Sequence, residues 1–486
     1  MVVKSNEEFP LKMNYDDKIN LHKDVPVFYR KRYYISFLAF FGMVISVLLR
    51  TNLSIAIVEM TSNKTITEGN ETRIKEAEFN WSSVEKGLIL SSFSFGYFFS
   101  PLGGMLASKY GGVTVFGVGI MITSVLTMLS PIFVRLNTIV FMIGRIFEGI
   151  AESCSISGSV EIFVHWAPEN EKSRLVGIGA SGFYFGAALA YPICGFAASL
   201  FGWEAMFVIT GGISLLWYFI WFVFVSNDPS SDKFISKKEK LYLAENVMGP
   251  PATEIKYPWA SILTSRPVWA FFNERLIAAW LVSFTIYCLP LYIKDVLNVD
   301  VKDIGLISFI PNFSSFLALS IASFITDYVR NLKIISISNV HKLFFTVAKI
   351  LSFIILVVMI LSMDFKTSIV CLTLFRFCYS FSDAASSVLP IDLAPYHAGL
   401  LVGLSTVVSS VGYVINPIIL GFIVRHHSVE EWRIYFALLC CCIIWAGIIF
   451  CIFGSGELEP WAKQKEFQKV YSEDKYEKEM EIKYSQ

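Results

Sequence analysis

Residues 205–225 read AMFVITGGISLLWYFIWFVFV and contain no charged side chain. An α-helix needs about 20 apolar residues to cross the hydrocarbon core of a bilayer. The whole chain shares this bias, because hydrophobic residues make up 55% of its 486 positions and charged residues only 16%. Soluble domains are usually about a quarter charged. The sequence therefore predicts an integral membrane protein in a lipid bilayer, and its net charge of zero gives no reason to expect a nucleic-acid partner.

Similar apolar runs recur along the chain and predict twelve membrane-spanning helices. They cover residues 34–59, 85–107, 114–134, 138–163, 175–200, 204–226, 268–293, 303–326, 342–362, 368–392, 398–424 and 432–454. The prediction is an all-α polytopic membrane protein made of two six-helix halves. Its parts are a tail at 1–32, a first half at 33–226, a polar linker at 227–266, a second half at 267–455 and a second tail at 456–486.

Lysine and arginine gather in three of the polar segments. The first tail ends in the cluster Arg30-Lys31-Arg32, the linker holds five lysines, and the second tail is lysine-rich. Loops rich in Lys and Arg stay on the cytoplasmic side of a membrane. We therefore expect both termini and the linker to be cytoplasmic, in either the plasma membrane or a lysosomal or endosomal membrane.

The loop at 61–83 follows the first predicted helix and so lies on the outer side. It contains three Asn-x-Ser/Thr sequons, at Asn63, Asn70 and Asn80. Such sequons are acceptors for N-glycosylation when they are exposed on the outer side of a membrane. The three asparagines are therefore glycosylation candidates, and they support the assigned orientation.

The two halves also resemble each other at one turn. The turn after the second helix reads GMLASKYGG at 104–112, and the turn after the eighth reads ASFITDYVR at 322–330. Internal repeats are typical of transporters that work by alternating access, with the substrate bound near the midplane between the halves. For the turn at 322–330 there is an alternative to a repeat, since any short cytoplasmic turn can have this composition.

Three charges interrupt the fourth predicted helix, in the sequence GRIFEGIAE at 144–152. Arg145, Glu148 and Glu152 follow one another at intervals of three and four residues, which places them on one face of a helix. Each would cost roughly 3 kcal/mol on a lipid-facing surface at the bilayer centre. We therefore expect all three to face the protein interior or a water-filled cavity.

Arg145 is placed to pair with Glu148, and Glu152 lies one turn further along. Two carboxylates this close do not both ionise cheaply, so we expect them to titrate as a coupled pair. Such a pair suits proton coupling. The alternative is a salt bridge that locks helices together, but a lock needs only one carboxylate.

Arg50 is the costly charge of the first helix, nearly twenty residues from the Arg30-Lys31-Arg32 cluster. A permanently charged, forked donor at that depth suits a carboxylate or phosphate substrate. The alternative is that Arg50 reaches an interface, if the helix begins later. No pair of histidines has zinc-ligand spacing on one helix, and there is no nucleophile elbow or phosphate loop. We therefore expect no metal, no cofactor and no enzymatic activity.

Several stretches together resemble one transporter family. They are LRTNLSIAIVEM at 49–60, FNWS at 79–82, WAPENEKSR at 166–174, PWASILTS at 258–265 and GSGELEPW at 454–461. The chain is similar to the anion–cation symporters of the major facilitator superfamily that include sialin, the vesicular glutamate transporters and the type I sodium–phosphate cotransporters. The resemblance implies a twelve-helix major facilitator fold with two pseudo-symmetric halves.

The resemblance also implies roles for individual residues. Arg50 matches the arginine that meets the substrate anion, Tyr97 is an aromatic residue retained in helix two, and Arg145 and Glu152 match the arginine and the acid linked to proton coupling. Glu148 resembles the sialin branch, whereas the glutamate branch has glutamine there. The glutamate branch also has a histidine at the position of Leu90. The chain therefore looks closer to sialin-like members than to vesicular glutamate transporters.

These observations predict a secondary transporter that moves a small organic anion, such as a sialic acid-like or uronate-like carboxylate, with a coupled proton. Arg50, Arg145 and Tyr97 are the predicted substrate-binding residues, and Glu148 and Glu152 are the predicted proton-coupling residues. The alternative is a carrier for inorganic phosphate or urate coupled to Na⁺, and a third possibility is an anion sensor with the same fold. We expect the protein to function as a monomer.

Overall fold

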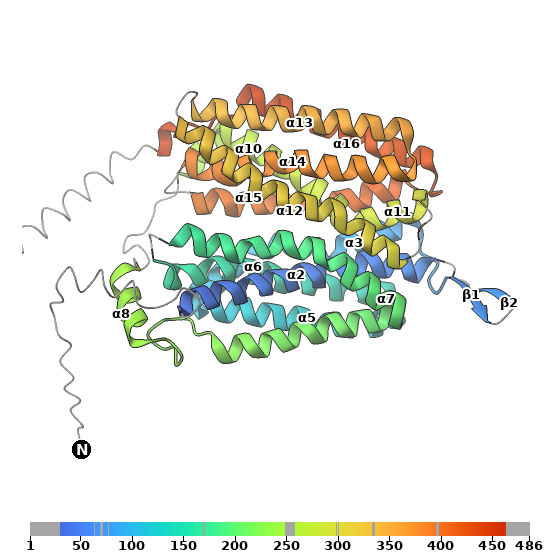
Figure 1. Cartoon of the computed structure of the whole chain (residues 1–486), viewed down its shortest axis with the longest axis horizontal. Helices are drawn as coiled ribbons and strands as arrows, with labels where there is room; N and C mark the ends of the chain where they lie inside the picture. Colours follow the sequence, from blue (N-terminus) through green and yellow to red (C-terminus); the bar gives the residue numbers. More distant parts are fainter. Residues whose placement is uncertain are drawn as a thin grey trace, which may run out of the picture.

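The computed structural model describes residues 30–62, 64–68, 71–75, 77–168, 171–247, 258–297, 299, 301–332, 336–394 and 398–462. They form two helical bundles that lie side by side, the first half below and the second half above in the view of Figure 1. The two halves and the twelve predicted spans are confirmed, although some spans consist of more than one helical segment.

The first half contains six spans. They are α2 (Lys31–Thr61), the continuous series α3 (Ser83–Phe95), η2 (Gly96–Phe99) and α4 (Ser100–Tyr110), then α5 (Gly112–Leu136), α6 (Thr138–Trp166) and the double-length α7 (Lys172–Phe224). Gly202 divides α7 into two spans, because its φ of 85° is incompatible with a right-handed helix. This break separates the runs that the sequence predicts at 175–200 and 204–226.

The second half repeats this arrangement. Its spans are the series α10 (Arg266–Ser283), η3 (Phe284–Cys288) and α11 (Leu289–Leu297), then α12 (Val301–Leu332), α13 (Ile337–Ser362), α14 (Phe365–Leu393), α15 (Ala398–Ile423) and α16 (Val429–Phe453). Side-chain caps set several of the starts: the Ser428 hydroxyl accepts from the backbone N–H of Glu431, and the Glu431 carboxylate accepts from that of Ser428. The segment η3 is a π-helical turn, a feature that is frequent at functional sites.

The distribution of side chains is that of a membrane protein. Among the described residues, eight helical stretches are long and apolar enough to cross a bilayer by length and composition alone. The helix α6 is not one of them, because Arg145, Glu148 and Glu152 interrupt its apolar sequence. All three of these charges are buried, while large apolar side chains such as Leu136 and Phe222 are exposed. The costly charges therefore face the interior of the molecule, and the exposed apolar side chains form an outer surface suited to contact with lipid.

The loop between α2 and α3 contains a β-hairpin that the sequence analysis did not predict. Strands β1 (Lys64–Glu68) and β2 (Glu71–Lys75) pair antiparallel, with Lys64 opposite Lys75. Asn80 follows the hairpin and is exposed, as a glycosylation acceptor must be. Asn63 and Asn70 lie outside the described residues.

The linker between the halves contains two short helices, α8 (Lys237–Asn246) and α9 (Trp259–Thr264). The helix α8 docks on the first half through Arg32, whose guanidinium lies 3.1 Å from Glu239 and 2.7 Å from Glu171. The end of the molecule that carries α8 is called the linker end below. The opposite end, which carries β1 and β2, is called the hairpin end (Figure 1).

The two halves approach each other closely at the hairpin end. A Cβ atom added to Gly87 of α3 would collide with the Pro417 carbonyl of α15, and the Ser91 hydroxyl donates to the Val414 carbonyl at 2.8 Å. Nearer the linker end, a Cβ atom added to Gly104 or Gly403 would meet no atom of the described residues within 4 Å. Glycine at Gly87 therefore permits the halves to close at the hairpin end.

Candidate substrate and coupling site

Arg50 lies where the two halves meet. It belongs to α2, eleven residues before that helix ends at Thr61, and it is only 1% exposed. Its Nε donates to the Tyr287 hydroxyl of η3 at 2.7 Å, and its Nη1 donates to the Tyr97 hydroxyl of η2 at 3.2 Å. The Tyr287 hydroxyl also lies 3.1 Å from the Ser94 hydroxyl. Arg50 thus joins its own half to the π-helical turn of the other.

Three aromatic rings surround this guanidinium. The Arg50 Cζ lies 5.1 Å from the ring centre of Tyr97, 5.3 Å from that of Tyr287 and 4.4 Å from that of Tyr413 in α15. We call Tyr97, Tyr287 and Tyr413 the tyrosine cage. Aromatic faces attract a desolvated cation, so the cage holds Arg50 without supplying a counter-charge. The Nη2 of Arg50 is buried and has no hydrogen-bond partner among the described residues.

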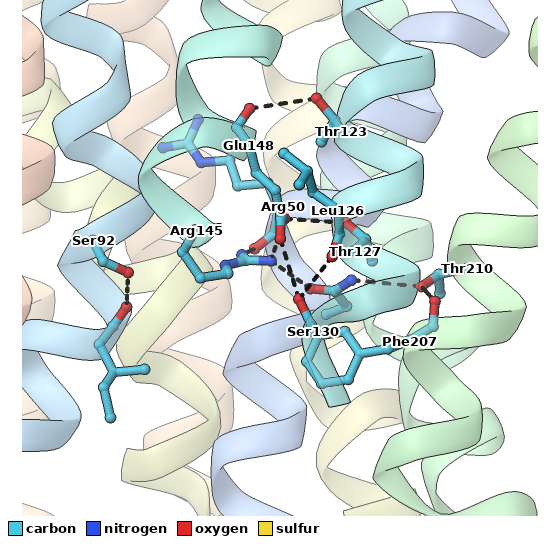
Figure 2. Close-up of polar contacts among 12 residues, drawn as sticks. Arg50, Ser92, Thr123, Leu126, Thr127, Ser130, Arg145, Glu148, Phe207 and Thr210 are labelled. Carbon is cyan, nitrogen blue, oxygen red and sulfur yellow. Dashed lines mark hydrogen bonds and ion pairs between the residues drawn. The ribbon is translucent and has the colours of Figure 1, made fainter. Parts of the chain in front are cut away.

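Glu148 lies in a separate, fully paired environment. Arg145 Nη1 donates to its Oε2 at 2.7 Å, Thr127 donates to the same oxygen at 3.0 Å, and Ser130 donates to Oε1 at 3.2 Å. Figure 2 shows these groups converging from α6 and α5. The carboxylate is buried, but each oxygen has a donor, as a charged group in a low-dielectric interior requires. Glu148 and Arg145 therefore form a neutral, tightly held pair.

Glu152 is one turn further along α6 and differs from Glu148. It is 1% exposed, and neither carboxylate oxygen has a hydrogen-bond partner among the described residues. The positive charges that act on it are Arg50 first and then Arg145, and Tyr97 also lies close. The structure thus places the two acids of α6 together, as the sequence predicted, but only Glu152 lacks an ion-pair partner.

The guanidinium of Arg145 contacts more protein acceptors than that of Arg50. Its Nη1 also lies 3.5 Å from the Asn52 side-chain oxygen, and its Nη2 donates to the Arg50 carbonyl at 3.4 Å. Its guanidinium lies over the Phe93 ring at 4.8 Å. These contacts position α2 against α6. A direct contact between Arg145 and the substrate remains a prediction.

The second half contains buried charges that the sequence analysis missed. Lys349 of α13 donates to Glu274 of α10 at 2.8 Å and to the Tyr379 hydroxyl of α14 at 2.7 Å, and Ser382 donates to the same Glu274 oxygen at 3.0 Å. Both charged side chains are buried. Arg376 and Asp383 of α14 are buried nearby. Each of these charges falls inside an apolar run, so a search of every run for ionisable residues would have found them.

We predict that Lys349→Met destabilises the folded protein strongly. The mutation leaves the Glu274 carboxylate buried without its ion-pair partner, which typically costs about 3–5 kcal/mol. The measurement is thermal unfolding of the purified protein in detergent. The double mutant Lys349→Met with Glu274→Gln should recover most of the loss, because no unpaired charge remains. A single mutant that unfolds at the wild-type temperature would contradict the structural role of this pair.

Comparison with family models agrees with this architecture. The Major Facilitator Superfamily model matches residues 39–348 and 283–475. Among solved structures, the chain is similar to a bacterial homologue of the human lysosomal transporter Spinster in an inward-facing, unoccupied conformation, with a TM-score of 0.65, 14% identity and coverage of 88% of this chain and 99% of that one. It is also similar to a D-xylose–proton symporter, with a TM-score of 0.65, 13% identity and coverage of 87% and 99%. These likenesses show the fold.

Comparison with individual curated proteins identifies the family within this superfamily. The chain is 31% identical to vesicular glutamate transporter 1 of Xenopus tropicalis over 443 residues, covering 90% of this chain and 77% of the relative. It is 29% identical to human sialin over 454 residues, covering 90% and 92%. These identities are nearly equal, so whole-chain similarity does not separate the two groups, and the closer relation to sialin rests on individual residues. The chain belongs to the sialin, vesicular glutamate and type I phosphate transporter family of the major facilitator superfamily.

Proposed function

We propose that this protein moves a small organic anion together with a proton by alternating access. The observation that carries the proposal is Arg50, a buried guanidinium with an unused donor at the meeting point of the two halves. A carboxylate is the natural partner of such a donor, because charge-assisted hydrogen bonds to guanidinium are among the strongest in proteins. The tyrosine cage adds hydroxyl groups that can contact the rest of the substrate.

Glu152 is the proposed proton carrier. Without substrate, Arg50 is the main positive charge that acts on Glu152. A substrate carboxylate bound to Arg50 neutralises that charge, so an ionised Glu152 would then be buried without compensation and would favour proton uptake. Anion and proton binding are therefore linked, and each raises the affinity of the other. Glu148 contributes to this coupling less directly, since Arg145 already compensates its charge.

We also propose that both termini and the linker end lie in the cytoplasm. The lysine-rich tails and linker support this orientation, and the exposed Asn80 near the hairpin end fits a loop on the outer side. With the halves in contact at the hairpin end, the structure then corresponds to a state closed to the outside. The plasma membrane and a lysosomal or endosomal membrane are both consistent with this arrangement.

The test is uptake by proteoliposomes that contain the purified protein. A panel of sialic acid, glucuronate, phosphate, glutamate and urate is offered under an inward proton gradient or an inward sodium gradient. We expect an organic carboxylate to accumulate with the proton gradient. Uptake that ignores pH and follows sodium would instead support the sodium-coupled phosphate or urate carrier. Binding without counterflow exchange would support the sensor.

A further inference from the structure

Arg376 is a second buried guanidinium with unused donors, and it belongs to the opposite half from Arg50. It lies in α14 and is 6% exposed. Its Nη2 donates to the Ser315 hydroxyl of α12 at 3.0 Å. Its Nε and Nη1 are buried and have no hydrogen-bond partner among the described residues. Burying a guanidinium with unpaired donors costs free energy unless an anion completes its hydrogen bonds.

The two arginines lie at the same depth. Arg50 is eleven residues from Thr61, and Arg376 is eleven residues from Phe365, each counted from the hairpin end of its helix (Figure 1). At 1.5 Å per residue, both lie about 16 Å from that end. Tyr287 and Tyr413 of the tyrosine cage are each ten residues from the hairpin end of their own spans. Both arginines thus lie on the level of the cage.

First-half tyrosines connect the two arginines across the interface. Tyr191 of α7 donates to the Thr285 carbonyl of η3 and lies within electrostatic range of Arg376 and Tyr287, and Tyr287 accepts the hydrogen bond from Arg50. Tyr184 lies seven residues, or about two turns, before Tyr191 on α7, and it lies within electrostatic range of both Arg376 and Tyr413. Tyr191 and Tyr184 therefore each lie near Arg376 of the second half and near a tyrosine that contacts Arg50 of the first.

The carboxylate of Asp383 does not occupy the free donors of Arg376. Asp383 lies two turns along the same helix, and Arg376 is the first positive charge that acts on it. No nitrogen of Arg376 lies within 4.0 Å of a carboxylate oxygen among the described residues, whereas Lys349 and Glu274 in the same half do form such a pair. Asp383 compensates part of the charge and leaves the donors available.

We propose that Arg376 binds a second anionic group of the substrate, so that the transported anion is a dicarboxylate whose two ends reach Arg50 in one half and Arg376 in the other. This inference rests on the proposed transport of an organic anion and specifies its class. A dianion that contacts both halves also favours their closure around it, since each half supplies one of the two charges. A monocarboxylate satisfies only one arginine and leaves the other unpaired.

The experiment measures how acids of matched length inhibit uptake of whichever panel anion the wild-type protein transports. The dicarboxylates are succinate, glutarate and adipate, and the matched monocarboxylates are butyrate, valerate and hexanoate. In the wild type we expect the best dicarboxylate to inhibit at concentrations at least about 10-fold lower than its monocarboxylate partner, as expected for one additional hydrogen-bonded charge pair. In Arg376→Gln this preference should disappear while monocarboxylate inhibition stays within about 2-fold.

Two further variants separate a binding role from a structural one. Arg376→Lys keeps the charge but not the fork, so it should retain part of the preference. Arg433→Gln removes a half-buried arginine of α16 that pairs with Glu430, and it should leave the preference unchanged. Equal inhibition by both acids in the wild type would overturn the inference even if Arg376→Gln fails to fold. So would a dicarboxylate preference that persists in Arg376→Gln. If the wild type takes up no anion of the panel, the proposed function itself is wrong.

Discussion

Replacing Arg50 with glutamine should reduce the uptake efficiency for the transported anion by at least about 100-fold. The mutation removes the guanidinium whose Nη2 is free for a substrate carboxylate, and a buried carboxylate without its partner typically loses about 3–5 kcal/mol. The measurement is kcat/KM for uptake into proteoliposomes, with protein content matched by size-exclusion chromatography. The loss should appear mainly in KM if the carboxylate contact is equal in ground and transport states.

Two variants test whether charge or geometry matters at this position. Arg50→Lys retains a positive charge but loses the planar fork and its fit to the tyrosine cage, so we expect an intermediate loss. Tyr413→Phe keeps the ring beneath the guanidinium, at 4.4 Å from it, and should bind substrate nearly as well as the wild type unless its hydroxyl contacts the anion. Wild-type kinetics in Arg50→Gln would remove Arg50 from the substrate site.

Replacing Glu152 with glutamine should abolish proton-driven accumulation and preserve substrate exchange. Glutamine has nearly the shape of glutamic acid but cannot take up or release a proton. If one proton moves with each anion, a gradient of one pH unit supports about a 10-fold accumulation, because one unit corresponds to 1.36 kcal/mol. The mutant should lose this accumulation. Counterflow exchange between labelled and unlabelled substrate needs no net proton movement and should continue.

The matched controls lie on the same helix. Glu161→Gln removes another carboxylate of α6, and it should leave proton-driven uptake intact. Glu148→Gln removes the negative charge that pairs with Arg145 and replaces one of the two accepting oxygens with an NH2 donor. We therefore expect loss of folded protein rather than a selective loss of coupling. Full proton-driven accumulation in Glu152→Gln would show that the proton is carried elsewhere, and the Glu274 region of the second half would then be the next place to look.

Much of the first-half site was predictable because the cost of a charge in a membrane depends on the residue itself. Arg50, Arg145, Glu148 and Glu152 stand out in apolar runs, and the interval between the last three places them on one helix face. The same reasoning applies to Glu274, Lys349, Arg376 and Asp383. The sequence analysis did not identify them, although each of them also places a charge inside an apolar run.

The roles of the two α6 acids could not be separated in this way. Glu148 and Glu152 have the same side chain, on the same face, one turn apart. They differ because Thr127 and Ser130 of α5 donate to Glu148, while Glu152 lies near Arg50 of α2. Which neighbours a helical residue receives depends on the rotation and crossing of the helices around it, and the sequence of α6 carries no information about either.

The sequence by itself determined the membrane, the two six-helix halves and the charges that must face inward. These follow from hydropathy and from the cost of burying a charge, which are summed residue by residue along the chain. Only the tertiary structure decided which charges are paired and which retain unused donors. Arg50 donates to Tyr287 across 237 residues of sequence, and Arg376 donates to Ser315 across 61 residues. Such contacts depend on how whole helices pack, so no local pattern predicts them.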